Sequence, residues 1–180
     1  VLLRQGIPAW TGFPPMLRLI GGCLLLASAW LALVEARQIG LVYLLSLLTL
    51  VWMADIAAYF GGKAFGRRKL AASISPAKSW EGVYSGFAGV CLLAAFWLWF
   101  DGLRPDDSLS LFGYLLGRGW FWLAAGAVLL TATSVVGDLL ESLVKRSAGV
   151  KDSSQLLPGH GGVLDRVDAL LPVLPVALML

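Results

Sequence analysis

Residues 137–168 read GDLLESLVKRSAGVKDSSQLLPGHGGVLDRVD. This stretch is a polar island, because the chain is strongly apolar on both sides of it. Charged groups are costly to keep beside such apolar runs, so we expect the polar island to be the functional part of the chain and the rest to be its scaffold. Its ionisable residues are Asp138, Glu141, Lys145, Arg146, Lys151, Asp152, His160, Asp165, Arg166 and Asp168.

The composition of the chain is that of an integral membrane protein. Of its 180 residues, 58% are hydrophobic and only 14% are charged, and the mean hydropathy is +0.80. About a quarter of the residues are charged in a typical soluble domain. Cys23 and Cys91 lie inside apolar runs, where we interpret them as small packing residues rather than as a disulfide or metal ligands. The sequence predicts an all-α fold, a polytopic bundle of transmembrane helices whose cytoplasmic polar loops form the site.

Apolar runs long enough to cross a bilayer recur along the chain. A helix needs about 20 mostly apolar residues to span roughly 30 Å of hydrocarbon. We find no internal repeat and no domain boundary, so we expect one membrane domain over residues 1–180. The predicted spans are about 17–34, 40–60, 83–100, 120–140 and 164–180, the last of which takes residues from the end of the polar island.

The charges of the loops predict how these spans are oriented. The loop 61–82 holds five cations and a single acid, and the polar island holds four more Lys and Arg residues. The intervening segment, 101–119, is net acidic. Because short loops rich in Lys and Arg stay on the cytoplasmic side, we expect both basic segments in the cytosol, where they can meet a soluble anionic substrate.

The first part of the polar island has the spacing of a helix face. Asp138, Glu141, Ser142 and Lys145 stand at positions i, i+3, i+4 and i+7, and they share one face if the preceding span continues through residue 146. Such a face can anchor a divalent cation and phosphate oxygens. The alternative interpretation is a solvated helix end with ordinary salt bridges.

The second part of the island, residues 157–168, reads LPGHGGVLDRVD. The proline and glycines around His160 favour a tight loop whose backbone N–H groups can approach an anion, although a structural hydrogen bond would explain the histidine equally well. Asp165 and Asp168 follow at i and i+3. Carboxylate ligands suit Mg²⁺, whereas zinc needs a Cys and His set that one histidine and two cysteines in apolar runs do not offer.

Two further blocks lie upstream. Residues 55–66 read DIAAYFGGKAFG, and residues 75–82 read SPAKSWEG. Asp55 is an ionisable residue near the end of a predicted span and is therefore a candidate site residue. The glycines form neither a Walker A loop nor a dinucleotide-binding motif, so no soluble nucleotide-binding fold is indicated. Lys78 also fits an ordinary amphipathic loop at the membrane interface.

These motifs resemble a known family. The spaced residues Ser142, Lys145-Arg146, Lys151-Asp152, Pro158-Gly159-His160-Gly161-Gly162, Asp165-Arg166 and Asp168 look like the signature of phosphatidate cytidylyltransferases, also called CDP-diacylglycerol synthases. The blocks 55–66 and 75–82 resemble that family in the same order, so the likeness covers residue 50, approximately, to the end. One departure is Ala77, where many members carry a second lysine.

The resemblance implies a Mg²⁺-dependent reaction in which CTP and phosphatidic acid give CDP-diacylglycerol and pyrophosphate; a second, monovalent cation is left open. Asp138, Lys145, Asp165 and Asp168 are the expected catalytic residues. Asp138 and Asp165 would hold the metal, with Asp168 as a ligand or as a partner of a ligand. The residues expected to bind the substrates are Ser142, Arg146, Lys151, His160, Gly161, Lys78 and Lys63.

The resemblance also implies the setting of the protein. We expect a bacterial inner membrane protein whose site faces the cytoplasm, with the lipid bilayer as its partner, no nucleic acid, and a homodimer as its assembly. The family has further N-terminal spans, and because this chain begins at Val1 rather than at methionine we expect it to be a fragment that lacks them.

Three other functions use similar residues. A proton-coupled transporter or ion channel also uses intramembrane carboxylates, but it predicts ionisable residues spread through several span centres. A CDP-alcohol phosphotransferase has a D-G-x-x-A-R pattern that this chain lacks, and a lipid phosphatase would use paired histidines, of which there is only one here.

Overall fold

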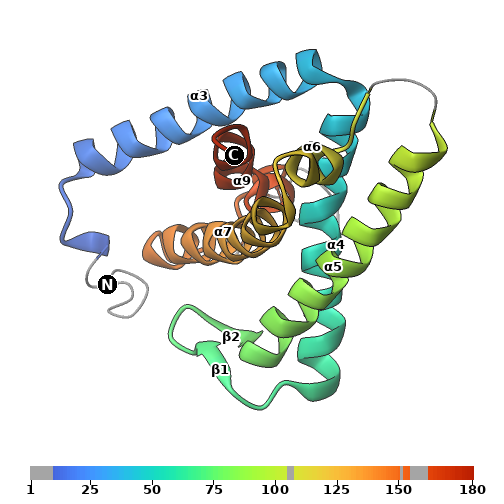
Figure 1. Cartoon of the computed structure of the whole chain (residues 1–180). Helices are drawn as coiled ribbons and strands as arrows, with labels where there is room; N and C mark the ends of the chain where they lie inside the picture. The colour runs from blue at the N-terminus through green and yellow to red at the C-terminus, as the bar shows by residue number, and fades with distance from the viewer. Residues whose placement is uncertain (1–9, 105–107, 151, 155–161) are drawn as a thin grey trace.

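The computed structural model, which describes residues 10–104, 108–150, 152–154 and 162–180, consists almost entirely of helices (Figure 1). Four of the described helices are long and apolar enough to cross a membrane. They contain most of the residues of the first four predicted spans, so the predicted all-α membrane fold is confirmed. These helices are α3 (Pro15–Ile39), α4 (Leu41–Phe65), α5 (Trp80–Leu103) and α7 (Trp120–Ser147).

The last predicted span, 164–180, contains two short helices. They are α8 (Leu164–Val167) and α9 (Leu170–Leu178). Both are shorter than the roughly 20 residues that a helix needs to cross a bilayer. Val173, Leu174 and Ala177 of α9 are buried, so this helix packs against its neighbours with much of its surface. The crossing of residues 164–180 stays a prediction.

Helices α4 and α5 lie side by side (Figure 1) and approach each other closely through small residues. A Cβ atom added at Gly86 would lie 2.9 Å from the Ala54 carbonyl oxygen, and one at Gly89 would lie 2.6 Å from the Ala57 Cβ. Membrane helices use such small residues because their association rests on close packing rather than on hydrophobic burial. The contact fixes Asp55 relative to the start of α5.

A β-hairpin connects α4 to α5, where the sequence predicted only a loop. Strands β1 (Lys69–Ala71) and β2 (Ser75–Ser79) pair in antiparallel fashion, with Lys69 opposite Ser79. The Glu81 carboxylate accepts hydrogen bonds from the backbone N–H groups of Arg67 and Arg68, at 3.1 Å each. Ser79 Oγ accepts from the Gly82 N–H at 3.2 Å and caps α5. These bonds fix the direction in which the hairpin leaves the helices.

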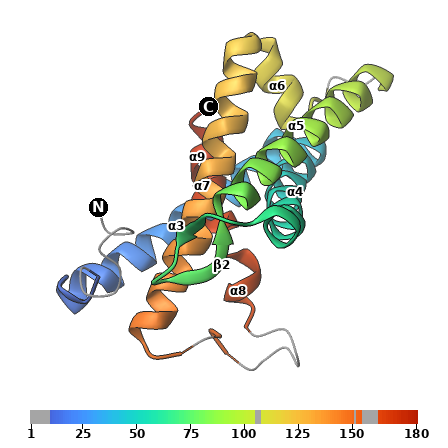
Figure 2. The ribbon, with the colours of Figure 1, turned by 90° about the horizontal axis from the view of Figure 1, so that it is seen from below.

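Helix α7 is central and connects the two ends of the molecule. Figure 2 shows the hairpin, α8 and the C-terminal end of α7 at one end, and α6 (Leu111–Gly117) with the start of α7 at the other. Helix α9 packs against both α3 and α7. The two basic segments of the chain, the hairpin region and the polar island, therefore meet at the same end.

Candidate active site

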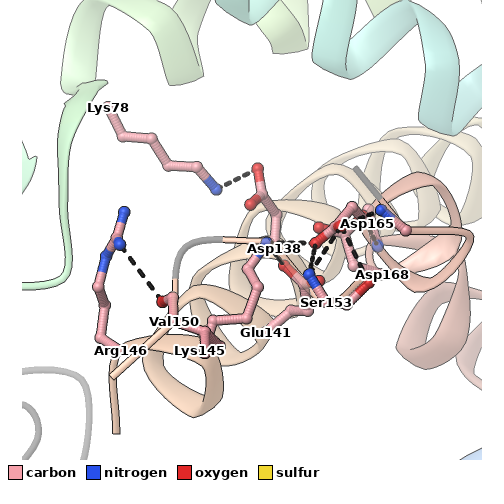
Figure 3. Close-up of polar contacts among 11 residues, drawn as sticks. Lys78, Asp138, Glu141, Lys145, Arg146, Val150, Ser153, Asp165 and Asp168 are labelled. Carbon is pink, nitrogen blue, oxygen red and sulfur yellow. Dashed lines mark hydrogen bonds and ion pairs between the residues drawn. The ribbon is translucent and has the colours of Figure 1, made fainter. Parts of the chain in front are cut away.

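Three carboxylates converge at the C-terminal end of α7 and form what we call the acidic cluster: Asp138, Glu141 and Asp168. The first two lie one turn apart on α7, because the helix continues to Ser147 as the spacing predicted. Asp168 follows α8. One oxygen of each carboxylate lies within 4.8 Å of the others, a spacing that a single divalent cation can bridge. Figure 3 shows the cluster together with the cations around it.

Glu141 gives the clearest sign that the acidic cluster fits a cation. Its side chain is 9% exposed and its Oε2 lies 2.5 Å from Lys145 Nζ. Its other carboxylate oxygen, Oε1, is buried and has no hydrogen-bond partner among the described residues. A buried carboxylate oxygen without a donor is costly, and a hard cation such as Mg²⁺ would remove that cost.

Lys145 connects α7 to α8. Its Nζ lies 2.5 Å from Glu141 Oε2 and 2.6 Å from Asp165 Oδ1, and its side chain is 17% exposed. The two ion pairs hold the ammonium group between two carboxylates. Lys145 is therefore positioned at the edge of the acidic cluster, as its place on the predicted helix face required.

Asp165 lies beside the acidic cluster, and its carboxylate oxygens accept hydrogen bonds from several protein donors. Its carboxylate accepts from the Ser153 backbone N–H at 3.0 Å, from Ser153 Oγ at 2.9 Å and from the Gly162 N–H at 2.7 Å, in addition to Lys145. Desolvation alone would raise the pKa of Asp165, but the hydrogen bonds from Lys145, Gly162 and Ser153 outweigh it and hold that pKa well below its usual range. Asp165 is thus an anion that fixes the segment around it.

The hairpin brings a second lysine to the site. Lys78, on β2, reaches across to α7 and forms an ion pair with Asp138 (Figure 3). The Lys78 side chain is 22% exposed and that of Asp138 is 33% exposed, so both remain accessible from solvent. Each acidic residue of α7 at the cluster therefore has a lysine partner from a basic segment of the chain.

A cavity of about 540 Å³, which we call the hairpin cavity, opens beside this ion pair. Its walls come from α4, the hairpin, α5 and α7, and its volume is in the usual range for a small-molecule site. Lys63 Nζ lies 6.0 Å from the centre of the Tyr59 ring. Ser134 Oγ donates to Asp55 Oδ1 at 3.5 Å. The polar residues of the lining include Asp55, Tyr59, Lys63, Ser75, Lys78, Ser79 and Asp138.

The structure brings most of the predicted site residues to one end of α7. Asp138 and Asp168 share the acidic cluster, Lys78 and Lys145 border it, and Lys63 lines the hairpin cavity. Ser142 is half-buried on α7, and Asp165 lies one ion pair away from the cluster. Arg146 is exposed and donates to the Val150 carbonyl oxygen at 3.4 Å. The predicted residues Lys151, His160 and Gly161 lie outside the described part of the chain.

Three residues of the site were not among the catalytic, metal-binding or substrate-binding residues expected from the family resemblance. Glu141 carried a usable signal, because it stands one turn after Asp138 and one turn before Lys145 on the polar face. Asp55 was a candidate only through its depth in a predicted span. Ser153 carried no signal, since its contact with Asp165 depends on the path of the chain between them.

The chain is similar to known proteins over most of its length. The model of the cytidylyltransferase family matches residues 4–180. A phosphatidate cytidylyltransferase of Pseudomonas aeruginosa is 48% identical over 161 residues, which are 88% of this chain and 55% of the relative. One from Haemophilus influenzae is 47% identical over 136 residues, or 76% and 44% of the two chains. One from Thermotoga maritima is 41% identical over 141 residues, or 78% and 49%.

The chain spans about half the length of these curated relatives. The match nevertheless extends over the four long helices and over the segments that carry the acidic cluster. The transporter alternative finds no support in these names. The chain belongs to the cytidylyltransferase family.

Proposed function

We propose that this chain is the catalytic part of an enzyme that transfers the cytidylyl group of CTP to phosphatidic acid, giving CDP-diacylglycerol and pyrophosphate. The names of the relatives supply the substrates. The observation that carries the proposal is the acidic cluster, in which a buried Glu141 oxygen has no donor while Lys78 and Lys145 stand on either side. Carboxylates and ammonium groups in this arrangement suit a reaction between two polyanions.

Asp138, Glu141 and Asp168 would hold the divalent metal, and their oxygen ligands favour Mg²⁺. When bound, Mg²⁺ would neutralise part of the charge on the phosphates of CTP. Asp165 would position Lys145 and the segment around Gly162. The alternative is that Asp165 is itself a metal ligand.

The hairpin cavity would receive CTP, because it opens beside Asp138 and is lined by two lysines, Lys63 and Lys78. Lys78 would exchange its ion pair with Asp138 for phosphate oxygens when CTP enters. Ser142, Arg146, Lys151, His160 and Gly161 remain proposed substrate-binding residues on the strength of the family signature.

The reaction joins an oxygen of the lipid phosphate to the α-phosphorus of CTP. The bond from that phosphorus to the bridging oxygen breaks, and pyrophosphate leaves with the electron pair. Lys78 and Lys145 would stabilise the charge that the phosphates bring together, which is the main obstacle in phosphoryl transfer. A phosphate monoester is largely ionised near neutral pH, so the lipid oxygen needs no general base.

The expected setting follows from the substrates. CTP is soluble, so the end of the molecule that holds both basic segments would face the cytoplasm, with the protein in the inner membrane of a bacterium. A single membrane domain and a homodimer complete the proposal, and the mass of the protein–detergent complex tests the dimer.

The test is pyrophosphate release by the full-length protein in detergent, with CTP in every sample and with phosphatidic acid and Mg²⁺ each present or absent. Release that requires both additions supports the proposed reaction. Release without the lipid would indicate CTP hydrolysis instead. No release from protein that is folded by its thermal unfolding profile would contradict the proposal.

A further inference from the structure

A second cavity lies along another face of α7, and we call it the α3 groove. It has a volume of about 630 Å³ and is lined by the first half of α3, the C-terminal half of α7 and the region of α8 and α9. Its walls are mostly apolar. The apolar residues of its walls include Leu17, Leu25, Leu26, Leu140, Val144 and Leu171.

The α3 groove and the hairpin cavity both reach the acidic cluster, but through different residues. Glu141 and Asp168 line the groove, whereas Asp138 lines the hairpin cavity. The acidic cluster therefore stands between a cavity with two lysines and a groove with apolar walls. A reaction between a soluble molecule and a lipid needs such an arrangement, because the two reactants come from different phases.

Among the described residues that line the α3 groove, Arg18 is the one cation. Its Nε atom is buried and has no hydrogen-bond partner among the described residues, while the neighbouring Leu17 and Leu19 are 57% and 65% exposed. An unpaired buried guanidinium nitrogen is costly. Guanidinium groups bind phosphate through paired, charge-assisted hydrogen bonds. Arg18 therefore favours the binding of an anion in the groove.

We propose that the α3 groove holds the phosphatidic acid substrate, with its acyl chains against the apolar walls and its phosphate attracted by Arg18 toward the acidic cluster. This inference rests on the proposed function. Two other occupants fit less well. An apolar helix in the groove would leave the Arg18 Nε atom without a partner, and a free phosphate ion would leave the apolar walls uncovered. Phosphatidic acid has an anionic headgroup that can pair with Arg18 and two acyl chains that can cover the apolar walls.

Two glycines allow the groove to be filled without disturbing the fold. A Cβ atom added at Gly21 or Gly22 meets nothing within 4 Å, and both residues line the groove. Gly22→Leu should therefore occupy the lipid position at little cost to the helix. Gly102→Leu, on α5 and outside both cavities, is the matched control, because a Cβ there also meets nothing within 4 Å.

The experiment compares full-length wild type with Arg18→Gln and Gly22→Leu. Arg37→Gln is the control for the charge, since Arg37 is exposed in the last turn of α3 and lies outside the groove. Two measurements are made: the apparent KM for phosphatidic acid and for CTP in mixed micelles, and equilibrium binding of radiolabelled phosphatidic acid without CTP. We expect Arg18→Gln to raise the KM for the lipid by about tenfold, the usual value of one charged hydrogen bond. Gly22→Leu should also raise the KM for the lipid, because the leucine side chain would fill space in the groove. The KM for CTP and both controls should stay within about twofold of wild type.

The outcomes separate this inference from the proposed function. If wild type turns over and neither variant changes the lipid KM, the groove assignment is overturned while the reaction stands. If wild type shows no lipid-dependent turnover, the proposed function fails, and the binding measurement then decides the groove alone. Loss of phosphatidic acid binding in both variants supports it, and binding equal to wild type overturns it. An equal rise in both KM values, or loss of folded protein in both variants, would mean that another protein segment fills the groove.

Discussion

Glu141 and Asp165 both form ion pairs with the Lys145 ammonium group, and their other contacts separate their roles. Asp165 accepts hydrogen bonds from Lys145, Ser153 and Gly162, so its oxygens are already satisfied. Glu141 has a buried oxygen that no described donor satisfies. A carboxylate with a free oxygen is the better metal ligand, whereas a satisfied one positions its neighbours.

This difference predicts distinct effects of two isosteric substitutions. Glu141→Gln should raise the Mg²⁺ concentration for half-maximal activity by at least about tenfold, because it removes a ligand charge. Asp165→Asn should lower kcat more than it changes the Mg²⁺ requirement, because it releases Lys145 and Ser153. Titration of activity and of direct Mn²⁺ binding by both variants checks the assignment. A larger loss of metal affinity in Asp165→Asn would restore Asp165 as the ligand that the sequence suggested.

Lys78 gives a second prediction for a single residue. If it exchanges Asp138 for the phosphates of CTP, Lys78→Ala should raise the KM for CTP by about tenfold and leave the KM for phosphatidic acid nearly unchanged. Lys69→Ala is the matched control, since Lys69 is an exposed lysine of the same hairpin that does not line the cavity. Equal kinetic effects from the two lysines would show that only the general charge of the hairpin matters.

At the scale of elements, the contact between α4 and α5 is the packing on which the hairpin cavity depends. Gly86→Val should destabilise the protein by about 1–3 kcal/mol, because a Cβ there would lie 2.9 Å from a backbone oxygen of α4. Gly102→Val, on the same helix with open space around it, should have a much smaller effect. Thermal unfolding in detergent measures both. A fall in Tm of the same size in the two variants would mean that valine lowers helix stability generally, without a specific effect on the contact.

The helices and strands differ in how well the sequence predicts them. The four long helices follow apolar runs of sufficient length, and the face of α7 follows from a spacing of three and four residues, so both were predictable. The hairpin was not, because strands of three and five residues carry too little pattern and are fixed by the distant carboxylate of Glu81. The contact of Asp165 with Lys145 joins residues 20 positions apart across a loop, and local spacing cannot encode it.

For the whole molecule, the two cavities and the acidic cluster give a consistent arrangement. A soluble nucleotide would enter beside the hairpin, and a lipid would enter between α3 and α7. The nucleotide would then not have to enter the bilayer, and the lipid would not have to leave it. The acidic cluster lies where the two routes meet. This arrangement requires that the end with the hairpin faces the cytoplasm and the end with α6 faces the opposite side.

That orientation can be tested with two single cysteines in a background without Cys23 and Cys91. Ser73→Cys lies in the exposed turn of the hairpin, and Gly117→Cys lies at the exposed end of α6, with nothing within 4 Å of its Cβ. We expect a membrane-impermeant maleimide to label residue 117 in intact spheroplasts and residue 73 only after permeabilisation, because short loops rich in Lys and Arg stay in the cytosol. Labelling of both variants in detergent is the control for access. Labelling of both positions from the same side would exclude the antiparallel path of the four long helices across the bilayer and, with it, the cytoplasmic entry of CTP.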